Sequence, residues 1–117
     1  MISLNIFNNK KIIVTGHTGF KGSWLSLWLS NLGADVIGIS NDIPSVPSHF
    51  ESIKLGNTIQ DLRFDIRDHG QISKIFQDIQ PDFVFHLAAQ ALVRESYENP
   101  IATWQTNTLG TINILES

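Results

Sequence analysis

Residues 16–24, GHTGFKGSW, hold three glycines at three-residue spacing and one lysine, directly after the apolar run KIIVT. A loop of this kind between a strand and a helix can cradle a nucleotide phosphate on backbone N–H groups, or it can be only a tight turn. An ATP-type P-loop needs Gly, four residues and then Gly-Lys-Ser/Thr. Here Lys21 precedes Gly22, so the residue order excludes a P-loop.

The three glycines can be given separate roles if the loop binds a dinucleotide. Gly16 would allow the tight turn, Gly19 would let a phosphate approach the backbone, and Gly22 would let the helix pack closely on the sheet. The spacing is Gly-x-x-Gly-x-x-Gly rather than the common Gly-x-Gly-x-x-Gly. Because the loop joins a buried strand to a helix, whose N-terminus attracts anions, nucleotide binding is favoured over a plain turn.

The residues after the second expected strand bear on the type of dinucleotide. An acid at this place binds a free ribose 2′-hydroxyl, whereas a basic residue binds a 2′-phosphate. The sequence reads Ser40-Asn41-Asp42, and no Arg or Lys occurs between Lys21 and Lys54, which favours NAD over NADP. Two alternatives stay open here: Asp42 either reaches the ribose or is a solvated turn residue, and Lys21 either contacts the cofactor or is an exposed first-turn side chain.

These candidate residues need a scaffold, and the hydrophobic pattern supplies one. Buried strands alternate with amphipathic helices, which predicts a parallel sheet with right-handed crossovers. We expect a Rossmann-like, doubly wound α/β fold with strand order 3-2-1-4. The expected strands cover residues 11–15, 34–40, 58–65 and 82–89, the expected helices cover 20–32, 68–79 and the run from Pro100 onward, and 41–56 is a long loop.

Two helical stripes carry most of the large apolar side chains. Phe20, Trp24 and Trp28 recur at fourfold spacing, which predicts a heavily covered helix with its tryptophans in the core. Asn99 and Pro100 predict the start of the last helix, as cap and first helical residue. Its expected stripe comprises Ile101, Trp104, Thr108, Ile112 and Leu115.

Composition limits the function classes. The 117 residues are 42% hydrophobic and 16% charged with a net charge of −3, as expected for part of one soluble, cytoplasmic domain. No basic surface indicates nucleic acid, and no apolar run is long enough for a membrane span. The sequence has no cysteine, and its four histidines lack metal-ligand spacing. Among them, His17 either bonds a cofactor phosphate or structures the loop, and His86 fits a packed strand histidine better than a catalyst.

Four segments together resemble the extended short-chain dehydrogenase/reductase family, over nearly the whole chain. VTGHTGFKG is similar to the glycine loop of that family, RFDIRD to its third-strand segment, HLAAQ to its fourth-strand segment and NTLGTINILES to the helix that follows. Within the family, the sequence is most similar to the sugar-nucleotide 4,6-dehydratases.

The resemblance implies a set of site residues and no catalytic residue in this chain. Asp65 would contact the adenine amine, Ile66 would flank its ring, and Asn107 would have a structural or cofactor-side role. The full expected NAD site is Gly16, Thr18, Gly19, Phe20, Lys21, Gly22, Ser40, Asn41, Asp65, Ile66, Leu87, Ala88, Ala89, Gln90 and Asn107. One wall of the sugar site would comprise Gln90, Leu92 and Val93.

Two departures from the family pattern shape the functional expectation. Many relatives have an acid where this chain has Ser40, and the family's Tyr-x-x-x-Lys pair is absent, since Tyr97 is followed four residues later by Ile101. We therefore expect residues 1–117 to be the N-terminal part of an NAD-binding domain in a longer, homo-oligomeric sugar-nucleotide dehydratase. An epimerase or reductase acting on a related sugar nucleotide, or a non-catalytic dinucleotide-binding regulator, are the alternatives.

Overall fold

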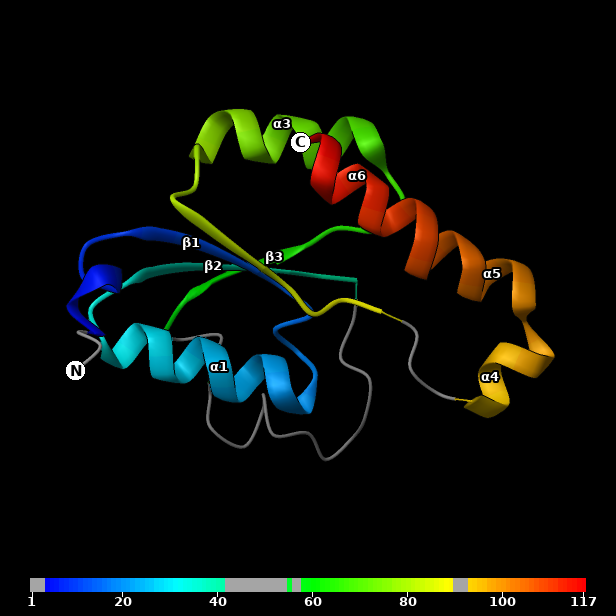
Figure 1. Cartoon of the computed structure of the whole chain (residues 1–117), viewed down its shortest axis with the longest axis horizontal. Helices are drawn as coiled ribbons and strands as arrows, with labels where there is room; N and C mark the ends of the chain where they lie inside the picture. The colour runs from blue at the N-terminus through cyan, green and yellow to red at the C-terminus, as the bar shows by residue number, and fades with distance from the viewer. Residues whose placement is uncertain (1–3, 42–54, 56–57, 90–92) are drawn as a thin grey trace.

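The computed structural model describes residues 4–41, 55, 58–89 and 93–117, and its centre is one parallel sheet (Figure 1). The strands are β1 (Lys11–Thr15), β2 (Asp35–Ser40), β3 (Gln60–Arg63) and β4 (Phe83–His86), in the order β3-β2-β1-β4. Every neighbouring pair is parallel. The predicted strand order and the Rossmann-like fold class are confirmed, although β3 and β4 are shorter than expected.

Helical elements connect the strands and follow the last of them. They are the 3₁₀ helix η1 (Leu4–Phe7), the α-helices α1 (Phe20–Asn31), α3 (His69–Ile79), α4 (Val93–Glu98), α5 (Pro100–Trp104) and α6 (Gly110–Glu116), and the π-helical turn η3 (Gln105–Leu109). Of the expected loop 41–56, only Asn41 and Leu55 lie in the described residues.

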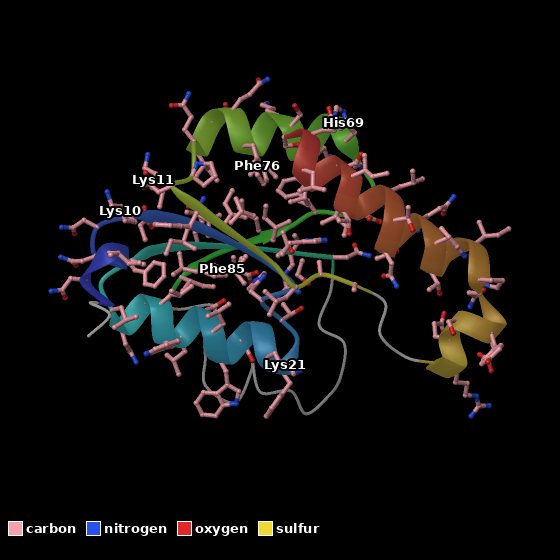
Figure 2. All side chains as sticks on the ribbon, in the orientation of Figure 1. Lys10, Lys11, Lys21, His69, Phe76 and Phe85 are labelled. Atoms are coloured by element: carbon pink, nitrogen blue, oxygen red, sulfur yellow. The ribbon has the colours of Figure 1, made fainter. Side chains whose placement is uncertain are left out.

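The helices form a layer on each face of the sheet. Helix α1 covers one face, while α3 and the α5–α6 run lie on the other (Figure 1). Successive residues of β1 point to opposite faces, so Ile12 packs in the core under α1 and Ile13 packs in the core under α3 and α6. Figure 2 shows Phe76 reaching from α3 toward the sheet and Phe85 lying between the sheet and α1.

The prediction that the aromatic stripe of α1 is core is wrong. Phe20, Trp24 and Trp28 are 69%, 51% and 52% exposed. The buried face of α1 consists instead of Gly22, Ser23, Ser26 and Leu29. The physical reason is close packing: small residues let the helix axis approach the sheet, and the bulky residues then have to occupy the outer side of the helix.

The last helix begins as predicted but differs in its course and burial. Pro100 is at its first position, yet the Asn99 side chain donates to Glu95 rather than capping the helix. The stripe expected to be buried is exposed in the described residues, with Trp104 69% and Leu115 79% accessible. The π-helical turn η3 separates α5 from α6. Helix α4, which precedes α5, was not predicted from the sequence. Among the described residues, no helix is long and apolar enough to cross a membrane.

Candidate functional site at the carboxyl edge of the sheet

A cavity of about 300 Å³ opens at the carboxyl ends of β1, β2 and β4. The chain runs from β1 outward to β2 and β3 on one side, and then returns to place β4 on the other side of β1. The gap between the carboxyl ends of β1 and β4 is therefore the topological switch point of the sheet. Open parallel sheets bind ligands at such a switch point. The cavity is lined by Gly16, Thr18, Gly19, Ser40, Asn41, Phe64, Asp65, Ile66, Arg67, Leu87, Ala88, Ala89 and Thr106.

The three loop glycines are glycine for different reasons. Gly16 has a φ of +78°, and a Cβ there would lie 2.8 Å from the backbone of Leu87 and Ala88. A Cβ on Gly22 would lie 2.0 Å from the carbonyl oxygen of Gly16. Gly19 has an ordinary φ of −75°, and a Cβ there would meet only the Gly16 oxygen, at 3.4 Å. The protein itself therefore requires glycine at 16 and 22 but leaves room for a Cβ at 19.

Gly19 is also the N-cap residue of α1, which opens at the cavity. The first N–H groups of a helix have no intrahelical partner and carry a partial positive charge. A glycine cap has no side-chain oxygen to offer them. An anion seated beside Gly19 would meet both the dipole and the backbone, which is the arrangement that binds phosphate.

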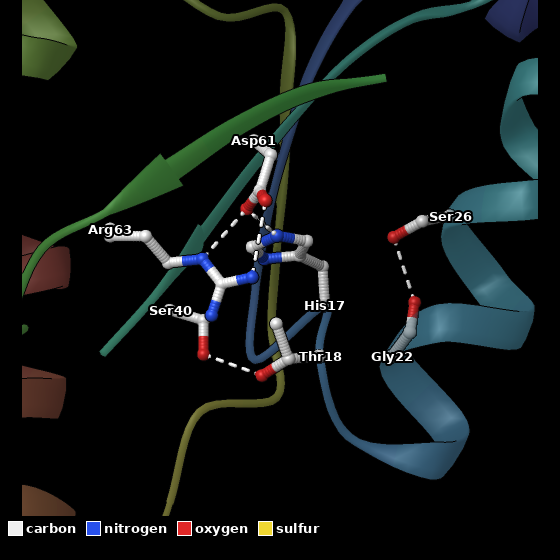
Figure 3. Close-up of polar contacts among 7 residues, drawn as sticks. All are labelled: His17, Thr18, Gly22, Ser26, Ser40, Asp61 and Arg63. Atoms are coloured by element: carbon white, nitrogen blue, oxygen red, sulfur yellow. Dashed lines mark hydrogen bonds and ion pairs between the residues drawn. The ribbon is translucent and has the colours of Figure 1, made fainter. Parts of the chain in front are cut away.

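His17 anchors the loop to the sheet. Its fully buried ring bonds Asp61 on β3 through Nε2, at 2.6 Å, and Arg63 donates to both carboxylate oxygens of Asp61 at 3.1 Å (Figure 3). A Cβ on Gly38 would lie 2.3 Å from the ring, so β2 needs glycine here to seat it. Of the two sequence-based alternatives for His17, this geometry supports loop structuring.

Burial sets the charge state of this group. It lowers the pKa of His17 and outweighs the hydrogen bond and the charge of Asp61, which act in the opposite direction. Burial raises the pKa of Asp61, but the bonds from Arg63 and His17 more than offset this, and the pKa is lowered overall. At neutral pH the arrangement is therefore a neutral imidazole donating to a carboxylate whose charge Arg63 balances.

The end of β2 is joined to the glycine loop by two hydroxyl groups. Thr18 Oγ1 and Ser40 Oγ lie 2.6 Å apart, and both residues are buried (Figure 3). Ser40 is thus tied to the loop at the place where many members of the resembled family have an acid. The cavity wall at this point is polar and uncharged.

Asp65 and Arg67 form an ion pair at the edge of the cavity. Arg67 donates to the Asp65 carboxylate from its backbone N–H at 2.9 Å and from Nε at 2.9 and 3.0 Å. The side-chain hydrogen bond from Arg67 is the main cause that holds the pKa of Asp65 below its usual range. Asp65 is an anion with its acceptor positions already engaged, so a ligand amine would have to share them with Arg67.

Most residues of the expected NAD site lie around one cavity, but four do not. Phe20, Lys21, Gly22 and Asn107 are outside its lining, and Gln90 and Leu92 lie outside the described residues. Helix α4 begins at Val93, so only the backbone of this residue is described among the three expected to wall the sugar site. Figure 2 shows Lys21 on the outer side of α1.

Three lining residues were not predicted: Phe64, Arg67 and Thr106. Phe64 and Arg67 flank the predicted Asp65 and Ile66, so sequence adjacency could have indicated them. Thr106 belongs to η3, and no sequence signal marks that π-helical turn. In the part of the chain that the structure describes, no group of three His, Asp or Glu residues could hold a metal ion.

The parallel sheet, the glycine loop entering α1 and the cavity at the switch point define a Rossmann-like α/β protein. A family model described as GDP-mannose 4,6 dehydratase matches residues 13–117. The chain belongs to this family.

Individual relatives agree with that assignment. The CDP-glucose 4,6-dehydratase of Salmonella typhimurium is 50% identical over 117 residues, which is 100% of this chain and 33% of that enzyme. An epimerase of Methanothermobacter thermautotrophicus superimposes with a TM-score of 0.84 at 34% identity, covering 97% of this chain and 32% of its own. The UDP-glucose 4-epimerase of Thermus thermophilus, solved with NAD, gives a TM-score of 0.77 at 33% identity, with 91% and 32% covered. The chain thus spans about a third of the length of these relatives.

Proposed function

We propose that this chain forms the NAD-binding part of a nucleotide-sugar 4,6-dehydratase that acts on CDP-glucose. The proposal rests on Gly19, the one glycine of the three in the loop whose Cβ would not clash with a protein atom. If the space beside Gly19 belongs to a pyrophosphate, the absence of a side chain there has a physical reason. The cavity residues therefore fit a dinucleotide on structural grounds of their own.

The charges around the cavity support NAD rather than NADP. A 2′-phosphate needs a basic partner near the end of β2. Two arginines lie near this place, Arg63 as the last residue of β3 and Arg67 four residues after it. Each is paired with an aspartate two residues earlier, Arg63 with Asp61 and Arg67 with Asp65. Ser40 and Asn41 offer polar groups to a ribose without a positive charge.

In the proposed reaction the same sugar is first oxidised and then reduced, so that no net oxidation takes place. Bound NAD would supply a hydride acceptor for C4 of the hexose and return the hydride to C6 after water has left C5 and C6. Residues of this chain would hold the cofactor: the α1 N-terminus its pyrophosphate, and Asp65 with Ile66 its adenine. The Tyr-x-x-x-Lys pair of the resembled family is absent from the sequence, so we propose that proton transfer to and from the sugar uses groups beyond residue 117.

The CDP-glucose assignment is supported by the 50% identical Salmonella typhimurium enzyme. An epimerase is the second candidate, because the two solved structures from Methanothermobacter and Thermus are epimerases. The two activities would share this cofactor cleft and differ in the fate of the 4-keto sugar.

Calorimetric titration with NAD and NADP, followed by product analysis with CDP-glucose, GDP-mannose and UDP-glucose, tests the proposal. We expect the complete protein to bind NAD more tightly than NADP and to form a 4-keto-6-deoxy sugar from CDP-glucose. Sugar inverted at C4 without loss of water would identify an epimerase instead. NAD binding without turnover of any sugar nucleotide would favour a regulator, and no NAD binding would contradict the proposal.

The 117-residue chain alone provides a matched control for the chemistry. We expect it to form no 4-keto sugar, because it lacks the proton-transfer pair. Product formed by the purified chain would show that the catalytic groups lie within these residues.

A further inference from the structure

A continuous line of hydrogen bonds crosses from the end of β1 to the last helical run, and His86 is its centre. His86 Nδ1 lies 2.6 Å from Thr15 Oγ1, and His86 Nε2 lies 2.9 Å from Thr111 Oγ1 on α6. Thr111 in turn donates to the carbonyl oxygen of Asn107 in η3, at 2.7 Å. Thr15 and His86 are register partners in the sheet, so the line begins at a rigid place.

The surrounding hydrogen bonds determine which atom donates and which accepts in each bond of this line. Thr15 Oγ1 accepts the N–H groups of Leu87 and Ala88, both at 3.1 Å, so its own proton is left to donate to His86 Nδ1. At the other end, a carbonyl can only accept, so Thr111 donates to Asn107 and its oxygen accepts from Nε2. Only the neutral imidazole with its proton on Nε2 satisfies both ends. Burial lowers the pKa of His86, which favours the same neutral state.

Each end of this line of hydrogen bonds lies at a different wall of the cavity. Leu87 and Ala88, held by Thr15, form part of the lining and pass directly against Gly16. Thr106, one residue before Asn107, lines the cavity from the helical side. The line therefore joins the wall formed by the glycine loop and residues 87–88 to the π-helical turn η3. Turns of this kind are rare and occur often at functional sites.

Helix α6 has a second attachment on the other side of the cavity. Asn113 Nδ2 donates to the carbonyl oxygen of Ile66 at 2.8 Å. Gly110 sits where a Cβ would be 2.5 Å from the tip of the Ile66 side chain. With Ile66 fixing one side, the bond from His86 to Thr111 determines how η3 approaches the β4 side of the cavity.

We propose that His86 is a positioning residue of the dinucleotide site, which as the Nε2–H tautomer holds η3 and Thr106 in place against the glycine-loop wall. This inference rests on the proposed function, since it names NAD as the ligand whose binding depends on that placement. His86 is not among the residues that line the dinucleotide cavity, and it acts through Thr15 and Thr111.

Three variants of the complete protein and one spectrum of the wild type test the inference. His86→Leu removes both bonds, while His86→Gln keeps an acceptor and a donor in one side chain. Thr111→Val removes the bond from His86 together with the bond that Thr111 donates to Asn107, and it keeps the shape of the residue. His69→Gln, on the exposed start of α3, is the matched control. The ¹⁵N spectrum of the imidazoles reports the tautomer directly and needs no ligand.

The affinity for NAD, measured by calorimetry, should fall about tenfold in His86→Leu and about fivefold in Thr111→Val, as the loss of buried hydrogen bonds implies. His86→Gln should stay within about threefold of wild type, and the control should be unchanged. If His86→Leu fails to fold, Thr111→Val and His86→Gln carry the test. Equal NAD affinity in Thr111→Val and wild type would overturn the inference.

The tautomer separates failure of this inference from failure of the proposed function. A wild-type protein that binds no NAD overturns the proposed function alone. In that case an Nε2–H signal for His86 would still support its role in holding η3. A proton on Nδ1 would overturn that role whether or not NAD binds.

Discussion

The two walls of the cavity are built by different means. The glycine-loop wall, formed by Gly16, Thr18 and Gly19 with Leu87 and Ala88, combines the side-chain anchors of His17 and Thr18 with close backbone packing. A Cβ on Gly22 would lie 2.0 Å from a carbonyl oxygen, and one on Gly16 would lie 2.8 Å from the chain after β4. The helical wall of η3 and α6 is held by side chains, through His86 with Thr111 and Asn113 with Ile66. The first wall has almost no freedom to adjust, whereas the second can adjust by rotating a side chain.

Because of this difference, the two walls should differ in how well they tolerate substitutions. Close backbone packing fails when one methyl group is added, because no rotamer relieves the overlap. Hydrogen bonds between side chains can be lost one at a time, each for about 1 kcal/mol. Changes at the packed glycines Gly16 and Gly22 should therefore act mainly on folding, and changes to the helical wall should act mainly on the fit of the ligand.

The largest expected effect is that of Gly22→Ala on the loop wall. The new methyl group overlaps the Gly16 carbonyl, so α1 has to move away from the loop, and we expect a loss of about 3 kcal/mol or more in the free energy of unfolding. Gly70→Ala in α3 is the matched control, since its Cβ would meet only Asp68 at 3.7 Å. It should stabilise by about 0.5–1 kcal/mol, as alanine does within a helix. Similar urea midpoints for the two variants would contradict the comparison.

Gly110→Ala applies the same change to the helical wall and should cost less. Its Cβ would meet the tip of Ile66, at 2.5 Å from Cδ1, and that side chain can rotate away. We expect a loss of about 1–2 kcal/mol, measured by the same urea unfolding. A cost equal to that of Gly22→Ala would show that the helical wall is as rigid as the loop wall.

Acid should weaken both walls through one histidine in each. Burial lowers the pKa of His17 and of His86 below the ordinary 6.5. The unfolded chain then binds these protons at a higher pH than the folded chain, so stability is complete above about pH 6.5 and declines as the pH falls toward the folded-state values. Urea unfolding at about pH 7.5 and about pH 5.5 measures the loss. His86→Gln should reduce this loss of stability, and a stability that rises on acidification would contradict the assigned sign.

The smallest effect is expected outside both walls. Arg94 and Glu98 form an i,i+4 ion pair on α4 with side chains 91% and 56% exposed. Arg94→Gln should change the free energy of unfolding by at most about 0.5 kcal/mol and leave NAD affinity unchanged. A weakened NAD complex in this variant would extend the site onto α4.

The contrast between the walls also explains what the sequence could predict. The glycine loop, the parallel sheet and its strand order follow from residue types at fixed spacing, and the structure agrees with them. The structure also gives a reason for glycine at 16 and 22, since a Cβ at either position would overlap backbone atoms, although Gly22 packs against Gly16 of the loop rather than directly on the sheet. Features that depend on residue types at short spacing can therefore be predicted from a sequence.

The helical wall depends on contacts between distant residues, and sequence reasoning missed it. His86 and Thr111 are 25 residues apart, and Asn113 and Ile66 are 47 apart. The π-helical turn has no compositional signal, so Thr106 was not expected at the cavity. The exposed Trp24 and Trp28 show a related limit, because a helical stripe indicates one face but not which face packs.

NAD affinity and melting temperature, measured on one variant, Gly19→Ala, test the central claim most directly. The φ of −75° and the distance of 3.4 Å between the added Cβ and the Gly16 oxygen leave the apoprotein room for a methyl group. We therefore predict a melting temperature close to wild type and an affinity for NAD reduced about tenfold or more, since the methyl group would occupy the space of the pyrophosphate. A lowered melting temperature with undiminished NAD affinity would contradict the account, because Gly19 would then serve the turn rather than the ligand.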